Sequence, residues 1–168
     1  SDQIVEMTSC CLCCTIRGDI RETPLALHGQ RERDKIPRFK RLVVESTGLA
    51  DPAPVIHTLI SEPSLDSRYM LGGVITAVDA INGAATLDAH IECEKQAAVA
   101  DRLVITKTDL ATDLISKKEL ENLKRKLMKL NPGAVILSRH DSNFDHHRLF
   151  DTSLYNPETK TINVRKWL

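Results

Sequence analysis

The sequence predicts an α/β fold in which a mostly parallel β-sheet carries helices on both faces. Short apolar runs rich in β-branched residues alternate with longer segments of helical periodicity along the 168 residues. Strands buried on both faces give such continuous apolar runs, and helices are the usual connections between parallel strands. Polar residues follow several of the runs, at the strand ends where open α/β sheets bind ligands.

Five segments predict the strands and four predict the main helices. The apolar runs occupy residues 4–7, 41–45, 73–78, 102–106 and 134–137. The helical patterns occupy residues 20–30, 54–60, 87–100 and 116–129. We expect Pro24 to interrupt the first helix early, and a capping box of Ser116 and Glu119 to begin the last.

Composition excludes several classes of function. The chain has 23 basic and 23 acidic residues, interspersed, so it lacks the positive surface of a nucleic-acid-binding or polybasic membrane-binding protein. No apolar run approaches the roughly 20 residues that span a bilayer. Four of the five cysteines lie within residues 10–14, whereas a secreted disulfide framework spreads its cysteines along the chain. We therefore expect a reducing, cytoplasmic setting.

The segment Cys11-Leu12-Cys13-Cys14 predicts a transition-metal site. Closely spaced thiolates select soft cations such as Zn²⁺, and Co²⁺ or Ni²⁺ where these are supplied. The alternatives are a disulfide and inert buried thiols, but adjacent cysteines rarely bridge each other. Cys93 lies within a helical pattern and is expected in the core.

Residues 106–109, with the sequence TKTD, predict a loop that reads guanine. The carboxylate of Asp109 can accept hydrogen bonds from the ring N–H and the exocyclic amine of guanine, a donor pair that adenine lacks. The aliphatic stem of Lys107 can cover the purine face, and the hydroxyl of Thr106 can tether a neighbouring segment. The alternative is a strand–helix turn in which Asp109 only caps a helix.

Residues 45–52, with the sequence ESTGLADP, predict contacts on the phosphate side of a nucleotide. Glu45 follows an apolar run and can hold Mg²⁺ through water or orient an attacking water, and Gly48 lets the backbone approach a phosphate. The alternative is that this segment only caps the next helix, which we favour for Asp51. We also favour a turn cap for Asp79 over a contact with the base-reading loop, and an exposed polar loop for His140 and residues 145–147.

Taken together, these motifs resemble the CobW-type GTPases, relatives of the UreG and HypB nickel-insertion proteins. The family carries a Gly-Cys-x-Cys-Cys motif, then Glu-x-Thr-Gly-x-Ala-Asp-Pro, Val-Asp-Ala and Asn/Thr-Lys-x-Asp, in the order found at residues 11–14, 45–52, 78–80 and 106–109. The resemblance implies a P-loop NTPase-like fold and a metal chaperone that hydrolyses the β–γ phosphoanhydride bond of GTP to gate metal delivery to a client protein.

The resemblance also assigns the site residues. It places metal ligation at Cys11, Cys13, Cys14 and Glu45 and phosphate sensing and catalysis at Glu45 and Gly48. Base reading falls to the TKTD loop of residues 106–109, through Thr106, Lys107 and Asp109. GTP, Mg²⁺ and Zn²⁺, or Co²⁺ or Ni²⁺ in its place, are the implied ligands.

Two departures from the family pattern shape our expectations. Cys10 stands where the family has glycine, and no segment matches its phosphate-binding loop and the strand before it. We therefore interpret residues 1–143 as a GTPase-domain fragment with weak or absent activity, and residues 144–168 as a terminal helix and linker toward a further domain. Unpaired strand edges would favour a homodimer. The alternative function is a metal-binding or redox module that works without nucleotide.

Overall fold

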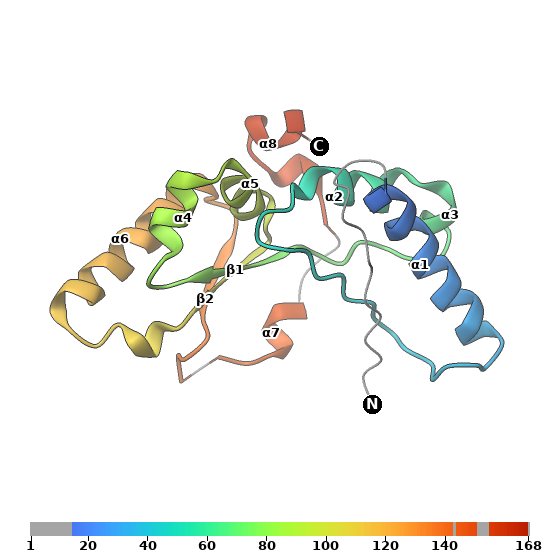
Figure 1. The fold of residues 1–168 in the computed structure, drawn as a ribbon, viewed down its shortest axis with the longest axis horizontal. Coiled ribbons are helices and arrows are strands. Elements are labelled where there is room, and N and C mark those ends of the chain that lie inside the picture. The colour runs from blue at the N-terminus through green and yellow to red at the C-terminus, as the bar shows by residue number, and fades with distance from the viewer. Residues whose placement is uncertain (1–14, 143, 151–154, 168) are drawn as a thin grey trace. The chain divides into compact units, whose positions relative to one another are not determined.

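The computed structural model describes residues 15–142, 144–150 and 155–167 of the chain. The chain divides into two compact units, Ser1–Met70 and Leu71–Leu168, which we call the N-terminal unit and the C-terminal unit. Figure 1 shows the elements of each. No helix in the described ranges is long and apolar enough to cross a membrane.

The N-terminal unit is helical in the part that the structure describes. Its helices are α1 (Thr15–Glu32), α2 (Pro52–Ser61) and α3 (Pro63–Asp66), and α1 packs against both of the others. The predicted interruption at Pro24 is wrong, because α1 continues through this residue with Pro24 and Ile20 buried. Burial of this helix face outweighs the single N–H that proline lacks.

The strand predicted over residues 41–45 does not form. The structure assigns no regular element to this segment, and Val43 is 67% exposed. A β-branched run becomes a strand only where a neighbouring backbone supplies a ladder of hydrogen bonds, and no described segment pairs with these residues. The strand predicted over residues 4–7 lies outside the described residues.

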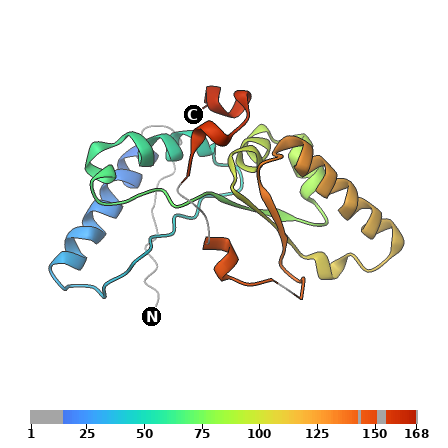
Figure 2. The same cartoon turned by 180° about the vertical axis from the view of Figure 1, so that it is seen from behind.

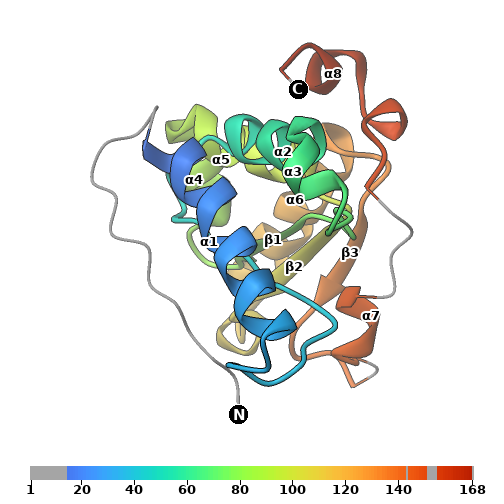
Figure 3. The same cartoon turned by 90° about the vertical axis from the view of Figure 1, so that its right-hand side faces the viewer.

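The C-terminal unit contains a parallel three-stranded sheet with the strand order β1-β2-β3. Its strands are β1 (Ile75–Asp79), β2 (Arg102–Thr106) and β3 (Val135–Ser138), seen side by side in Figure 3. Its helices are α4 (Gly83–Ala89), α5 (Ile91–Val99), α6 (Leu114–Leu130), α7 (His147–Phe150) and α8 (Ile162–Trp167), with short 3₁₀ turns η1 (Thr108–Leu110) and η2 (Pro157–Thr159). The predicted α/β fold is thus confirmed, and the prediction for β2 is correct at both ends.

Helices lie on both faces of this sheet. Val78, Leu103 and Ile105 point from one face into a core shared with residues of α4, α5 and α6. Helices α4 and α5 connect β1 to β2, and α6 connects β2 to β3. Two successive right-handed connections that advance in the same direction across a sheet place their helices on the same face. Arg102 points to the other face, where its guanidinium donates a hydrogen bond to the carbonyl of Arg148 in α7 at 3.2 Å.

Two helix boundaries differ from the prediction. The pattern over residues 87–100 is broken at His90, whose extended backbone separates α4 from α5. Helix α6 is capped by Asp113 rather than by Ser116, because one carboxylate oxygen of Asp113 accepts the N–H groups of Ile115 and Ser116, each at 2.8 Å. A carboxylate at the N-cap accepts hydrogen bonds from two otherwise free N–H groups, and its negative charge interacts favourably with the positive end of the helix dipole.

The end of the chain packs on its own unit. The sequence predicts a terminal helix and linker over residues 144–168, and the structure places the short helices α7 and α8 there, on different sides of the strands (Figures 1 and 2). Val164 and Tyr155 are buried, and Lys95 of α5 lies over the ring of Trp167 at 5.8 Å from the ring centroid. These contacts hold the last described residues against the sheet and its helices.

Candidate functional site at the carboxyl ends of the strands

The carboxyl ends of the three strands bring three connecting segments to one edge of the sheet. Asp79 at the end of β1 is in register with Thr106 at the end of β2, and Ile105 is in register with Ser138 at the end of β3. Because the strands are parallel, the segments that follow them start side by side. We call this edge the carboxyl rim, defined as residues 79–82, 106–110 and 138–141.

The predicted base-reading segment, residues 106–109, lies in the carboxyl rim directly after β2. The hydroxyl of Thr106 donates to the carbonyl of Val78 at 3.3 Å, and the carbonyl of Thr106 accepts the N–H of Ala80 at 3.0 Å. Both bonds tether the start of the segment to β1 and the residue after it. The Thr106 hydroxyl therefore acts as a tether, as expected for threonine at this position.

Lys107 carries an unusual backbone conformation. Its φ of 58° and ψ of 26° lie in the left-handed region, and the 3₁₀ turn η1 begins immediately after it. A residue with a Cβ pays about 1 kcal/mol or more in this region, so the surrounding structure must hold it there. Such conformations cluster at ligand sites, and this one turns the chain so that Lys107 and Asp109 both belong to the rim.

Asp79 joins two segments of the rim. One carboxylate oxygen accepts the N–H groups of Ile81 at 2.7 Å and Asn82 at 3.1 Å, and the other lies 2.7 Å from the Lys107 ammonium. The hydrogen bond from Lys107, and then those from the backbone, outweigh partial burial and lower the pKa of Asp79 to about 2. The sequence favoured the turn cap over a contact with the base-reading loop, and this carboxylate does both.

Asp109 contacts a residue that the sequence did not assign to this site. Its carboxylate lies 3.1 Å from Nδ1 of His140, which follows β3 by two residues, and both side chains are about half exposed. We expected His140 in an exposed polar loop without a role. The signal that could have found it is positional, because a polar residue just after a neighbouring parallel strand reaches the same rim.

Glu45 and Gly48 belong to the N-terminal unit. Glu45 is exposed, and the Thr47 carbonyl accepts the N–H of Ala50 at 3.1 Å to form a turn around Gly48. A Cβ built on Gly48 would meet no atom of the described residues within 4 Å outside its chain neighbours. Asp51 caps α2 by accepting the N–H of Ala53 at 3.0 Å, which confirms the expected capping role.

The predicted metal ligands Cys11, Cys13 and Cys14 lie outside the described residues. Within residues 15–142, 144–150 and 155–167, no group of three or more His, Cys, Asp or Glu side chains is placed to hold a metal ion. Cys93 packs against the core, and burial raises the pKa of its thiol, so the expectation of a core cysteine is confirmed.

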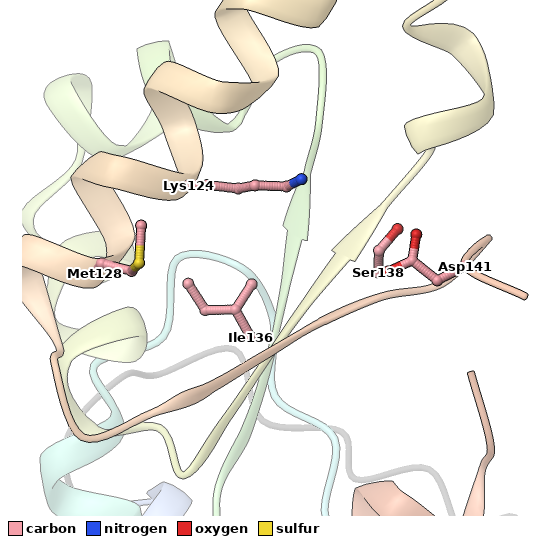
Figure 4. Close-up of a pocket in the computed structure, with 5 residues that line it drawn as sticks. All are labelled: Lys124, Met128, Ile136, Ser138 and Asp141. Carbon is pink, nitrogen blue, oxygen red and sulfur yellow. The ribbon is translucent and has the colours of Figure 1, made fainter. Parts of the chain in front are cut away.

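A small hollow opens beside β3 and α6 (Figure 4). It has a volume of about 220 Å³ and is lined by Lys124, Met128, Ile136, Ser138 and Asp141. This is smaller than the roughly 300–1,000 Å³ of most ligand pockets, and we assign it no ligand. Ser138 and Asp141 nevertheless show where the rim continues past the end of β3.

Comparison with known proteins places this arrangement in a wider context. Residues 1–138 match the family model described as CobW/HypB/UreG, nucleotide-binding domain. Zinc chaperone YjiA of Escherichia coli is 32% identical over 163 residues, which are 97% of this chain and 49% of YjiA. Zinc-regulated GTPase metalloprotein activator 1 of Schizosaccharomyces pombe is 28% identical over 167 residues, which are 94% of this chain and 36% of that protein. The chain thus spans about half or less of the curated relatives that it matches.

Solved structures agree with these relatives. The crystal structure of Zn(II)-bound YjiA GTPase from E. coli superposes with a TM-score of 0.69 at 30% identity, covering 85% of this chain and 46% of that chain. A Zn(II)-bound triple mutant of YjiA GTPase superposes with a TM-score of 0.66 at 34% identity, covering 76% of this chain and 38% of that chain. The similarity therefore extends from individual motifs to the arrangement of the strands and helices.

Proposed function

The chain belongs to the CobW/HypB/UreG family of nucleotide-binding domains, and from this premise we propose that it is the guanine-nucleotide-binding part of a GTP-dependent zinc chaperone. In this proposal the protein binds GTP and Zn²⁺, and hydrolysis of GTP to GDP and phosphate gates delivery of the metal to a client metalloprotein. The relatives named as zinc chaperones and zinc-regulated GTPases support the choice of zinc and of GTP.

The observation that carries the proposal is the base-reading loop at the carboxyl rim. Asp109 presents a half-exposed carboxylate there, which can accept the ring N–H and the exocyclic amine of guanine. The side chain of Lys107 is half exposed in the same loop. Its aliphatic stem can therefore cover the purine face, whether the ammonium stays paired with Asp79 or leaves it. Thr106 fixes the start of the loop on β1.

Glu45 and Gly48 take the phosphate side in this proposal. The exposed carboxylate of Glu45 is suited to orient the water that attacks the γ-phosphate and to hold a water ligand of Mg²⁺. The open space around Gly48 is suited to a close approach between its N–H and a phosphate oxygen. Mg²⁺, when bound, neutralises charge on the phosphate oxygens during transfer to water.

Zinc is the cargo rather than a resident cofactor in this proposal. Cys11, Cys13 and Cys14 supply thiolates, with Glu45 as an oxygen ligand and as the residue shared with the phosphate side. A shared ligand gives the physical basis for coupling, because a change at the phosphates changes what Glu45 offers to the metal. Binding to thiols must release protons, so zinc affinity should rise with pH.

Nucleotide competition tests the first half of the proposal. In the protein expressed from its complete reading frame, we expect GDP and GTP to displace a fluorescent guanine nucleotide and ATP to fail. Asp109→Ala should weaken GDP by about 100-fold or more, since two hydrogen bonds to a charged group are lost. Asp109→Asn should gain xanthine nucleotides, because its amide can donate to the carbonyl at position 2 of xanthine. Equal affinity of wild type for ADP and GDP would refute guanine recognition.

Metal titration tests the second half. We expect Cys13→Ser to lose tight zinc binding, and GTP to change zinc affinity in wild type but not in Asp109→Ala. If zinc binds tightly to wild type with an affinity that ignores GTP, the chain is instead a metal-binding or redox module that works without nucleotide. If Cys13→Ser binds zinc as wild type does, the cysteine segment is not the metal site.

A further inference from the structure

A chain of side-chain contacts ties the loop after β2 to the loop after β3. The hydroxyl oxygens of Thr108 and Ser138 lie 3.2 Å apart, and the Thr108 hydroxyl lies 3.4 Å from Nδ1 of His140. The same Nδ1 lies 3.1 Å from Oδ1 of Asp109. Three loop side chains and Ser138 at the end of β3 therefore form one continuous network that ends on the Asp109 carboxylate.

The geometry of this network determines where its protons lie. An ionised carboxylate only accepts hydrogen bonds, so Nδ1 of His140 must carry the proton that it shares with Asp109. Nδ1 is then not an acceptor for Thr108, and the Thr108 and Ser138 hydroxyls share a hydrogen bond in which either can be the donor. The direction of the bond between His140 and Asp109 is therefore set, with Asp109 as the acceptor.

The position of His140 is fixed by the sheet. The N–H of Arg139 donates to the carbonyl of Ile105 at 2.9 Å, which continues the β2–β3 ladder one residue past the end of β3. His140 therefore starts from a backbone that is held against β2 itself. Asp109, by contrast, lies in the three-residue turn η1 with a half-exposed side chain.

A carboxylate in such a place needs an anchor to read a base. The terminal torsion of aspartate is broad, so a half-exposed Asp109 without a partner would rotate among many orientations. His140 contacts Oδ1 alone, and in the described part of the chain Oδ2 of Asp109 has no hydrogen-bond partner. A carboxylate has about four acceptor sites, so one bond to His140 leaves sites on both oxygens for the two donors of guanine.

We propose that His140 is a positioning residue for guanine recognition, which holds the Asp109 carboxylate in the orientation that accepts both guanine donors. This inference rests on the proposed function, because it assigns a second residue to the same base site. Asp109 is the charged group that contacts His140, whereas Thr108 and Ser138 in the same network are uncharged. The sequence neighbours of His140 are the charged residues Arg139 and Asp141. The benefit is preorganisation, since the orientation is fixed before the nucleotide arrives.

Two substitutions separate the donor from the ring. Asparagine places its amide nitrogen the same number of bonds from Cα as Nδ1 of histidine, so His140→Asn keeps a donor near Asp109. Glutamine places its nitrogen one bond farther, so His140→Gln removes the donor from that position while keeping an amide. His140 is about half exposed, so we expect all variants to fold with unchanged urea midpoints.

The readout compares GDP with inosine diphosphate, which lacks the exocyclic amine of guanine. Discrimination between the two measures the second hydrogen bond to Asp109 and responds to carboxylate orientation, whereas a general loosening of the site weakens both nucleotides alike. In the complete protein, His140→Ala and His140→Gln should each lower the affinity for GDP by about 5- to 10-fold and the affinity for inosine diphosphate by about twofold or less. His140→Asn should keep both affinities within about twofold of wild type.

Other outcomes overturn the inference in identifiable ways. Tighter GDP binding by His140→Ala would mean that His140 competes with the base, and an unchanged ratio between the two nucleotides would mean that it does not orient Asp109. In either case wild type still prefers guanine over adenine and Asp109→Ala still loses that preference, so the proposed function survives. If wild type shows no guanine preference, the proposed function and this inference both fail.

Discussion

Strand β2 has a lysine–aspartate pair at each end, and the two pairs differ in what surrounds them. At the carboxyl end, Lys107 pairs with Asp79, and their side chains are 56% and 24% exposed. At the amino end, Lys160 pairs with Asp101, and their side chains are 5% and 19% exposed. The two aspartates are therefore similarly sheltered, whereas the lysine is half exposed at one end of the five-residue strand and buried at the other.

The amino end is satisfied within the chain. The Lys160 ammonium also donates to the carbonyl of Ala100 at 3.1 Å and lies over the ring of Tyr155, while Asp101 accepts the N–H of Val74 at 2.8 Å. The buried side-chain amide of Asn131 likewise donates to the carbonyl of Ala97 at 2.9 Å and to that of Ala100 at 2.8 Å. Breaking any of these contacts would leave a buried polar group unpaired.

The carboxyl end is more open to solvent. Lys107, Asp109 and His140 are about half exposed, so water can replace their contacts at little cost, and the left-handed backbone of Lys107 adds local strain. The difference teaches that the residue pair alone does not define a role. The exposure of the lysine decides how much such a pair contributes to the stability of the fold.

The largest expected effect distinguishes the two lysines. Lys160→Met should lower the free energy of unfolding by about 3–5 kcal/mol, because it leaves the Asp101 carboxylate buried without its cation. Lys107→Met should lower it by less than about 1 kcal/mol, because the lysine that it removes is half exposed. Urea titration measures both, followed by the fluorescence of Trp167, the single tryptophan of the chain, which reports on α8.

A second substitution tests the cause of that loss. Adding Asp101→Asn to Lys160→Met removes the uncompensated charge and should recover a substantial part of the stability. Equal losses in Lys160→Met and Lys107→Met would show that exposure does not separate the two ends of β2. A loss in Lys160→Met that Asp101→Asn does not relieve would point to packing of the lysine stem instead.

The sequence predicts the strands of the C-terminal unit well because their burial leaves a local signature. Residues 103–105 are buried and apolar without interruption, so β2 is predicted at both ends. The run at residues 41–45 has the same local signature but no described ladder partner, and propensity alone does not supply one. The cap of α6 was ambiguous for a related reason, since Asp113 and Ser116 both satisfy local capping rules.

The site was predictable only where a motif marks it. The TKTD motif identifies Asp109 as a candidate site residue. The contact between Asp109 and His140, however, spans 31 positions and depends on the β2–β3 register, which local patterns do not encode. The pairing of Lys160 with Asp101 spans 59 positions and depends on where the end of the chain packs. Long-range pairs of this kind follow from topology, so a sequence without its fold shows the residues but not their partners.

Acid should remove the stabilising contribution of the ionised Asp79 carboxylate in the carboxyl rim between about pH 4 and pH 2. The folded-state pKa of Asp79 is about 2, below the unfolded value near 3.9, so its contribution is present above about pH 4 and is lost as pH falls toward 2. Allowing for the exposure of Lys107, we expect about 1 kcal/mol. Urea unfolding between pH 5 and pH 2 should show a gap between wild type and Asp79→Asn that closes with acid. A gap that stays constant would mean that the ionised carboxylate is not responsible.

The smallest effect concerns a buried hydroxyl at the amino end, that of Tyr155. Tyr155 is buried, its hydroxyl has no hydrogen-bond partner in the described residues, and burial followed by the charge of Asp101 raises its pKa. Among the described residues this hydroxyl has therefore exchanged water for no hydrogen bond. Tyr155→Phe should therefore be neutral or raise the free energy of unfolding by up to about 1 kcal/mol, measured by urea titration.

The other tyrosine of the chain is the matched control, since its hydroxyl donates to the carbonyl of Pro24 at 2.9 Å. The same removal of one oxygen at Tyr69→Phe should lower the free energy of unfolding by about 0.5–1.5 kcal/mol, because a formed bond is lost. Opposite signs would show that partners, rather than residue type, set the energy. A loss of similar size at Tyr155→Phe would mean that its hydroxyl has a partner, most simply an ordered water, because only a bonded hydroxyl costs stability when it is removed.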